Sequence, residues 1–138
     1  MKKIVLGVIF AILIASPVFA DYENDLWYLS RVIQAESGYC ERQMQEYVGS
    51  VVLNRVEDER FPNTIEGVVT QTDPCIQYST YTSLASQEPT NQVIEVAKDL
   101  LENGSKLPGD VIYQANDILG PVYTSLSTSY STMYFCIG

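Results

Sequence analysis

The chain has 138 residues, with 8 basic and 17 acidic side chains, three cysteines and no histidine. The acidic excess, spread without a basic cluster, argues against a nucleic-acid partner, because affinity for nucleic acid comes mainly from cationic contacts to phosphates. Without histidine, Ser-His and Cys-His nucleophile pairs and His-ligated zinc sites are excluded. We therefore expect carboxylate chemistry with neither a metal nor a cofactor.

Residues 1–20 are typical of an export signal, with Lys2 and Lys3 before an apolar stretch and a small-residue cleavage site before Asp21. An uncleaved membrane anchor is the alternative, although the apolar stretch is short for a spanning helix. Cleavage would leave 138 − 20 = 118 residues with a net charge of 6 − 17 = −11. That length suits one compact domain, residues 21–138, which we expect to be secreted, monomeric and without stable membrane insertion.

Helical periodicity and capping signals predict four helices before a C-terminal β region. Asn24 or Asp25 is the expected cap of the first helix and Thr90 that of the fourth, with Gly38 and Gly104 at their exits. Between the third and fourth helices, the sequence loses its helical period and predicts a long polar loop, a kind of segment that is often functional. The expected extents are 24–36, 41–54, 62–69 and 90–103 for the helices and 70–89 for the loop.

The last part of the chain is β-branched and aromatic in residues 111–115 and 131–137, on either side of Gly120-Pro121. This pattern predicts a hairpin or a small antiparallel sheet. No internal repeat or linker divides the chain. The predicted fold class is α+β, a mainly helical domain with a small C-terminal antiparallel sheet.

One glutamate continues the apolar stripe of the first helix. Leu26, Leu29, Ile33 and Glu36 are spaced by three, four and three residues, so they share one helical face. Burial disfavours the ionised form of a carboxyl group, which suits it to protonate a leaving oxygen.

A glycoside hydrolase normally needs a second carboxylate, about 5 to 9.5 Å from the first. The candidates in this chain all lie in polar segments that are typical of solvated surface charge. They are Glu41, Asp58, Asp73, Asp110 and Asp117. A mechanism with a single acid therefore fits the sequence better.

Several short motifs agree in order and spacing with one known family. They are Arg31-Val32-Ile33, Ala35-Glu36, Gln45, residues 51–56, 61–65 and 67–69, and Gln71, with weaker matches at Ala97, Gly104, Tyr113 and Asn116. The chain resembles the SleB/CwlJ type of cell-wall hydrolase, the spore cortex-lytic family, which is similar to lysozyme-like and lytic transglycosylase domains. The resemblance implies a lysozyme-like fold and places the enzyme outside the cytoplasm, at the cell wall or spore.

In that family a glutamate at the end of a helix cleaves the glycan strand of peptidoglycan, and Glu36 corresponds to it. The resemblance implies cleavage of the bond between N-acetylmuramic acid and N-acetylglucosamine. With a single acid, the expected enzyme is a lytic transglycosylase that leaves an anhydromuramyl end. The expected substrate contacts are Ser37, Gln45, Tyr47, Tyr113, Gln114 and Asn116, whereas Asn54 and Arg55 are expected to hold the Phe61-Pro62 turn.

The chain departs from the family pattern near the expected site. The family has glycine at Tyr39 and Met44, an acidic residue at Cys40 and a histidine near Tyr134. The resemblance therefore leaves the substrate open between vegetative wall, spore cortex and foreign wall.

Two other functions are weighed against glycan cleavage. The first is a catalytically inactive wall-binding or inhibitory module of the same fold, against which an intact Glu36 argues. The second is an esterase or peptidase using Ser37 or a cysteine, which would lack a histidine base.

Three cysteines in an exported chain allow one disulfide. The resemblance would bring the terminal strand back beside the first helix, which implies a bond between Cys40 and Cys136 with Cys75 unpaired. A bond between Cys75 and Cys136 is the alternative.

Overall fold

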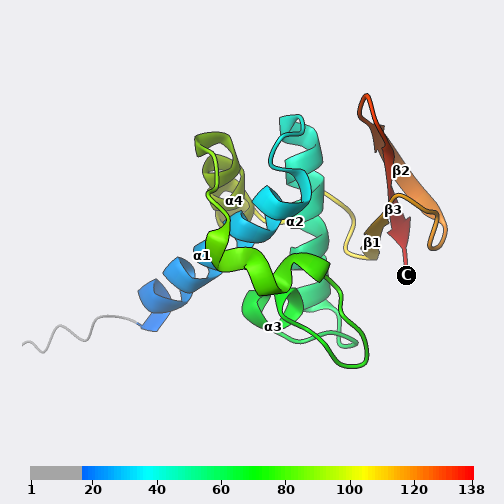
Figure 1. The fold of residues 1–138 in the computed structure, drawn as a ribbon. Helices are drawn as coiled ribbons and strands as arrows, with labels where there is room; N and C mark the ends of the chain where they lie inside the picture. The colour runs from blue at the N-terminus through cyan, green and yellow to red at the C-terminus, as the bar shows by residue number, and fades with distance from the viewer. Residues whose placement is uncertain (1–16) are drawn as a thin grey trace, which may run out of the picture.

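The structure, a computed structural model, describes residues 17–138, with side chains from Asp21 onward; most of the expected export signal lies outside the described residues. Helices α1, α2 and α4 pack together, α3 and η1 cross them on one side, and the sheet lies beyond α2 (Figure 1). The elements are α1 (Pro17–Ser37), α2 (Arg42–Glu57), α3 (Ile65–Val69), the 3₁₀ helix η1 (Ser79–Ser86), α4 (Asn91–Asn103), β1 (Val111–Ala115), β2 (Val122–Ser127) and β3 (Thr132–Ile137). The predicted α+β class is confirmed.

Helix α1 begins earlier than expected. Its described part runs from Pro17 to Ser37. Asn24 therefore lies inside the helix, where its amide donates to Glu66 Oε2 at 3.2 Å instead of capping the helix. The helix continues across the expected cleavage point between Ala20 and Asp21.

The ends of the other helices follow local signals. Helix α2 runs three residues beyond the expected Asn54, to Glu57. Thr90 caps α4 as predicted, because its hydroxyl accepts from Val93 N at 3.2 Å. Gly104 ends α4 with a φ of 88°, a left-handed conformation that favours glycine.

The prediction of a long loop over residues 70–89 is wrong for its second half. Residues 79–86 form η1, and this helix packs against α1. Tyr78 and Leu84 anchor the segment because both are buried in the core, at 2% and 3% exposure. The Ser83 hydroxyl donates to Thr80 O and the Ser86 hydroxyl donates to Ser83 O, and these hydrogen bonds stabilise the tight turns of η1.

Aliphatic side chains from α1, α2 and α4 form the core. Leu29 and Ile33 of α1, Val48 and Val52 of α2, and Val96 of α4 are all fully buried. No helix among the described residues is both long enough and apolar enough to cross a membrane.

The sheet is antiparallel with strand order β1-β3-β2. The expected pairing of residues 111–115 with the terminal strand is confirmed, and β2 adds a third strand. Phe135 of β3 meets Tyr47 of α2 edge-on, with ring centroids 5.3 Å apart, which identifies the face of the sheet directed at the helices. Paired residues of neighbouring strands share a face, so Gln114 and Thr124, both opposite Phe135, also lie on this inner face.

The expected disulfide between Cys40 and Cys136 is absent: both are free, as is Cys75, so the alternative pair is absent too. Side chains alternate along a strand, so Cys136 points to the face opposite Phe135 and away from α2. Cys40 lies beside the β2–β3 turn. Cys136 lies four residues further along β3 than Thr132, where the strand begins after this turn, and four residues of strand span about 13 Å. A disulfide requires Cα atoms within about 7 Å.

Candidate active site

The structure places Glu36 in the last turn of α1, as predicted. Leu29 and Ile33 of the same face are fully buried, and the Glu36 side chain is half-buried at the end of their stripe. Thr80 of η1 donates its hydroxyl to Glu36 Oε1 at 2.9 Å. No hydrogen bond to Oε2 is present within the described part of the chain, so one carboxyl oxygen is held and the other is free to meet a substrate.

Tyr78 brings a second hydroxyl to this region. Its side chain is 98% buried, and the phenolic oxygen has no hydrogen-bond partner among the described residues. Burial raises the pKa of Tyr78 above its ordinary value of 10.0; the Arg55 guanidinium opposes the rise, and the Glu36 carboxylate adds to it. Tyr78 therefore keeps its proton and remains a hydrogen-bond donor near the acid.

Arg55 connects α2, the sheet and the aromatic residues of the site. Its Nε donates to Ile112 O at 2.8 Å, and its guanidinium lies 5.2 Å from the ring centroids of both Phe61 and Tyr78. One terminal nitrogen of this buried guanidinium has no partner among the described residues. Arg55 thus supplies a positive charge beside Tyr78 while it contacts the Phe61 turn, as expected.

The expectation that Asn54 also holds the Phe61-Pro62 turn is wrong. The Asn54 amide instead donates to Pro108 O at 2.7 Å and to Val111 O at 3.0 Å. Asn54 therefore attaches α2 to the segment that leads into β1.

Two predicted substrate contacts have their polar groups turned into the protein. The Gln45 side chain is fully buried: its amide nitrogen is 3.1 to 3.4 Å from the carbonyls of Ser37, Gly38 and Cys40, and its amide oxygen accepts from Gln92. Ser37 is 3% exposed and donates back to Ile33 O at 3.0 Å. Both residues stabilise the turn that follows α1, so their polar groups have a structural role and are not presented to a substrate.

The remaining predicted contacts are divided by the register of the sheet. Tyr113 pairs with Cys136, on the face opposite Phe135, so it does not share the inner face with Gln114. Asn116 is exposed and donates to Thr132 O at 3.3 Å. Gln114 fits the predicted role of a substrate contact better, because its side-chain oxygen is buried without a hydrogen-bond partner among the described residues.

Tyr47 stays a candidate contact on α2. Its ring packs against Phe135, and its hydroxyl accepts from Gln43 at 3.3 Å.

Tyr78 and Thr80 are the functional candidates that the sequence did not single out. The only signal for them was the length of the polar segment between the third and fourth predicted helices.

None of the candidate second carboxylates is a buried, unpaired acid that could act together with Glu36. Glu41, Asp73, Asp110 and Asp117 are all exposed. Asp58 accepts from Arg60 at 2.7 and 2.8 Å, and these bonds lower the pKa of Asp58 to about 2.

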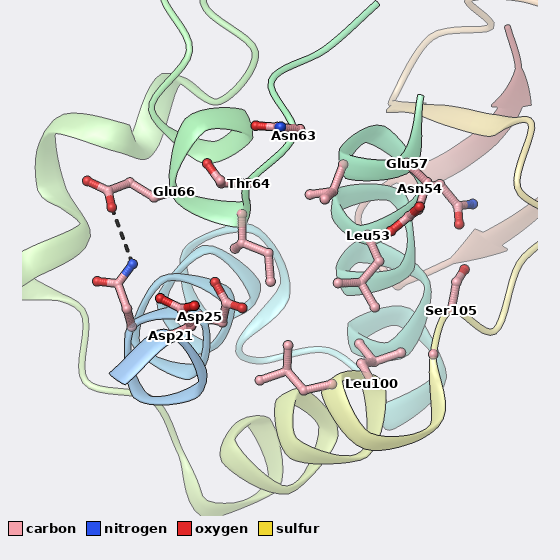
Figure 2. A pocket seen from close by; sticks show the side chains of 15 residues that line it. Asp21, Asp25, Leu53, Asn54, Glu57, Asn63, Thr64, Glu66, Leu100 and Ser105 are labelled. Atoms are coloured by element: carbon pink, nitrogen blue, oxygen red, sulfur yellow. Dashed lines mark hydrogen bonds between the residues drawn. The ribbon is translucent and has the colours of Figure 1, made fainter. Parts of the chain in front are cut away.

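A pocket of about 610 Å³ lies near the other end of α1 (Figure 2). Its lining includes the carboxylates of Asp21, Asp25, Glu57 and Glu66. Burial raises the pKa of Asp25, and the neighbouring charge of Asp21 adds to this effect. Asp25 is eleven residues from Glu36, about 16 Å along the helix, so this pocket is separate from the candidate site.

The described side chains contain no group of three or more acidic, cysteine or histidine residues that could hold a metal ion.

Residues 41–135 match the family model of the cell wall hydrolases. The chain belongs to this family. The match begins five residues after Glu36, so the family assignment does not itself give Glu36 a role.

Two solved structures share the fold of this cell wall hydrolase. The catalytic domain of the germination-specific lytic transglycosylase SleB from Bacillus anthracis has 18% sequence identity and a TM-score of 0.62, covering 82% of this chain and 94% of that one. The catalytic domain of the Bacillus cereus SleB protein also has 18% identity, with a TM-score of 0.61, covering 83% of this chain and 90% of that one. No curated protein sequence matches the chain. The resemblance to SleB-type enzymes is therefore confirmed for the family and the fold.

Proposed function

We propose that this cell wall hydrolase is a secreted lytic transglycosylase that cleaves peptidoglycan between N-acetylmuramic acid and N-acetylglucosamine. Its family supports the cleavage of peptidoglycan, and its fold is that of a lytic transglycosylase domain. The observation that carries the assignment of Glu36 is the bond from Thr80, which orients one carboxyl oxygen and leaves the other free.

In the first step Glu36, in its protonated form, donates its proton to the glycosidic oxygen. The bond between the anomeric carbon of the muramyl residue and that oxygen then breaks, and the leaving sugar departs with a free hydroxyl. General acid catalysis of this kind contributes about 10²- to 10⁴-fold to a rate.

In the second step the Glu36 carboxylate accepts the proton of the muramyl 6-hydroxyl as its oxygen attacks the anomeric carbon. An intramolecular 1,6-anhydro ring forms, and Glu36 is protonated again for the next cycle. The bond from Thr80 keeps the carboxyl group in one orientation through both steps.

Tyr78 and Arg55 are proposed to stabilise the negative charge that develops on the Glu36 carboxylate when it gives up its proton. The Tyr78 hydroxyl and one Arg55 nitrogen are buried without partners among the described residues, so each has a hydrogen bond left to donate. Gln114, with an unpartnered side-chain oxygen on the inner face of the sheet, is the proposed contact for a sugar hydroxyl or acetamido group.

We expect the products to end in 1,6-anhydromuramic acid, because the five candidate second carboxylates are either exposed or, as Asp58 is, paired with an arginine. The purified enzyme would be incubated with peptidoglycan in oxygen-18 water and the released sugars analysed by mass spectrometry. The proposal requires product ends without heavy oxygen. Reducing ends that carry the label would show hydrolysis instead, and Glu41, Asp73 and Asp110 would then be tested as the partner acid.

Thr80→Val should lower kcat about 10- to 100-fold without unfolding the enzyme. Valine has nearly the shape of threonine but cannot donate to Glu36, and a hydrogen bond to a charged group contributes about 1.5 to 3 kcal/mol. Turnover of labelled peptidoglycan would be compared with that of Thr82→Val, at an exposed position of η1 with no side-chain hydrogen bond among the described residues. Equal activity in the two variants would contradict the role assigned to Thr80.

A further inference from the structure

A hollow of about 770 Å³ lies between the turn that joins α1 to α2 and the tip of the β2–β3 hairpin. Its walls are residues 39–41, 43 and 44 on one side and 126–130 on the other, and we call it the tyrosine hollow. Tyr39 and Tyr130, one from each wall, are both 99% exposed. A single exposed aromatic side chain is ordinary, but two on opposite walls of one concave surface indicate a binding site for a ligand.

Both walls of the tyrosine hollow are already held in place. The α1–α2 turn is fixed by Gln45, which bonds to the carbonyls of Ser37, Gly38 and Cys40. The hairpin tip is fixed by Thr128, whose hydroxyl accepts from the amides of Tyr130 and Ser131 at 3.2 and 3.1 Å. A ligand would therefore find the two tyrosines presented on ordered backbone.

The chemistry of the lining suits a neutral sugar. Met44 and Leu126 supply apolar surface, Ser127, Thr128 and Ser129 supply hydroxyl groups, and the rings of Tyr39 and Tyr130 supply flat faces. The lining includes one carboxylate, Glu41, and neither lysine nor arginine, and the nearby Arg42 is bound to Glu46 at 3.0 Å. An anionic ligand would be repelled here, whereas a pyranose ring can place its apolar face on an aromatic ring and its hydroxyls on polar groups.

One wall of the tyrosine hollow lies close to Glu36 along the chain. Tyr39 follows Glu36 by three residues, so their Cα atoms are at most about 11 Å apart. A glycan strand that reacts at Glu36 would extend past this turn. We propose that the tyrosine hollow is an accessory subsite for a neutral N-acetylhexosamine residue of the same strand. This inference rests on the proposed function of Glu36.

The test uses the full chain as exported and replaces both tyrosines. Tyr39→Ala combined with Tyr130→Ala should raise KM for long, peptide-free glycan strands about tenfold and leave kcat unchanged, because stacking is lost while the catalytic groups remain. The combination of Tyr39→Phe with Tyr130→Phe keeps both rings and should behave like the unmodified enzyme. Tyr123→Ala is the matched control, because Tyr123 is half-exposed on β2 and does not line the hollow.

A binding measurement separates this inference from the proposed function. Chitohexaose, a neutral N-acetylglucosamine oligomer, would be titrated into each protein by calorimetry, which requires no turnover. Weaker binding in the double alanine variant alone would support the subsite even if the enzyme failed to cleave glycan. The inference is overturned if chitohexaose does not bind the unmodified chain, if the double alanine variant binds it equally well, or if Tyr123→Ala weakens binding as much.

Discussion

Glu36→Gln should reduce glycan cleavage by about 10²- to 10⁴-fold or more, because an amide can neither donate the proton to the glycosidic oxygen nor accept one from the 6-hydroxyl. Glutamine keeps the shape of the side chain, and its carbonyl oxygen can still accept from Thr80, so the fold should be retained. Dye release from labelled peptidoglycan would measure the activity, and thermal unfolding would confirm the fold.

Glu88→Gln is the matched control, because Glu88 is an exposed glutamate outside the site. It should retain normal turnover. If Glu36→Gln also retained near-normal turnover, the acid would lie elsewhere in the chain. If the unmodified chain bound peptidoglycan without cleaving it, the alternative of an inactive wall-binding module would replace the enzyme assignment.

Asn54→Leu should lower the free energy of unfolding by about 2 to 4 kcal/mol. Leucine branches at the same carbon as asparagine but cannot donate, so the carbonyls of Pro108 and Val111 lose their bonds from α2. A polar group left buried without its partner costs about 1 to 3 kcal/mol. Urea unfolding followed by circular dichroism would measure the change.

The control for this substitution is Asn63→Leu, at an exposed position with no side-chain hydrogen bond among the described residues. It should change the free energy of unfolding by less than about 0.5 kcal/mol. Comparable losses in both variants would mean that the two bonds from Asn54 do not hold the sheet segment to α2.

Local patterns were sufficient for the helices and for the position of the acid. The spacing of Leu29, Ile33 and Glu36 predicted one helical face, because side chains three and four residues apart lie together on a helix. Thr90 and Gly104 marked the ends of α4 through capping, which depends on a few neighbouring residues. The family resemblance, which came from short motifs in order, also led to the correct fold.

The surroundings of Glu36 depended on contacts between distant segments. Thr80 is 44 residues from Glu36, and only the packing of η1 against α1 brings its hydroxyl to the carboxyl group. Gln45 was among the expected substrate contacts. In the structure its amide is used to satisfy buried backbone carbonyls, a demand that arises only once the chain turns between α1 and α2.

The sheet shows most clearly what tertiary structure decided. The sequence by itself determined the strand character of residues 111–115 and 132–137 through their β-branched and aromatic side chains. It did not determine which face each side chain takes, because a shift of one residue in register moves a side chain to the opposite face. The irregularity in pairing between Val111 and Tyr113 places Tyr113 opposite Cys136 and Gln114 opposite Phe135. That register, fixed by packing of Phe135 against α2, separated Cys136 from Cys40 and left Gln114 on the face directed at the helices.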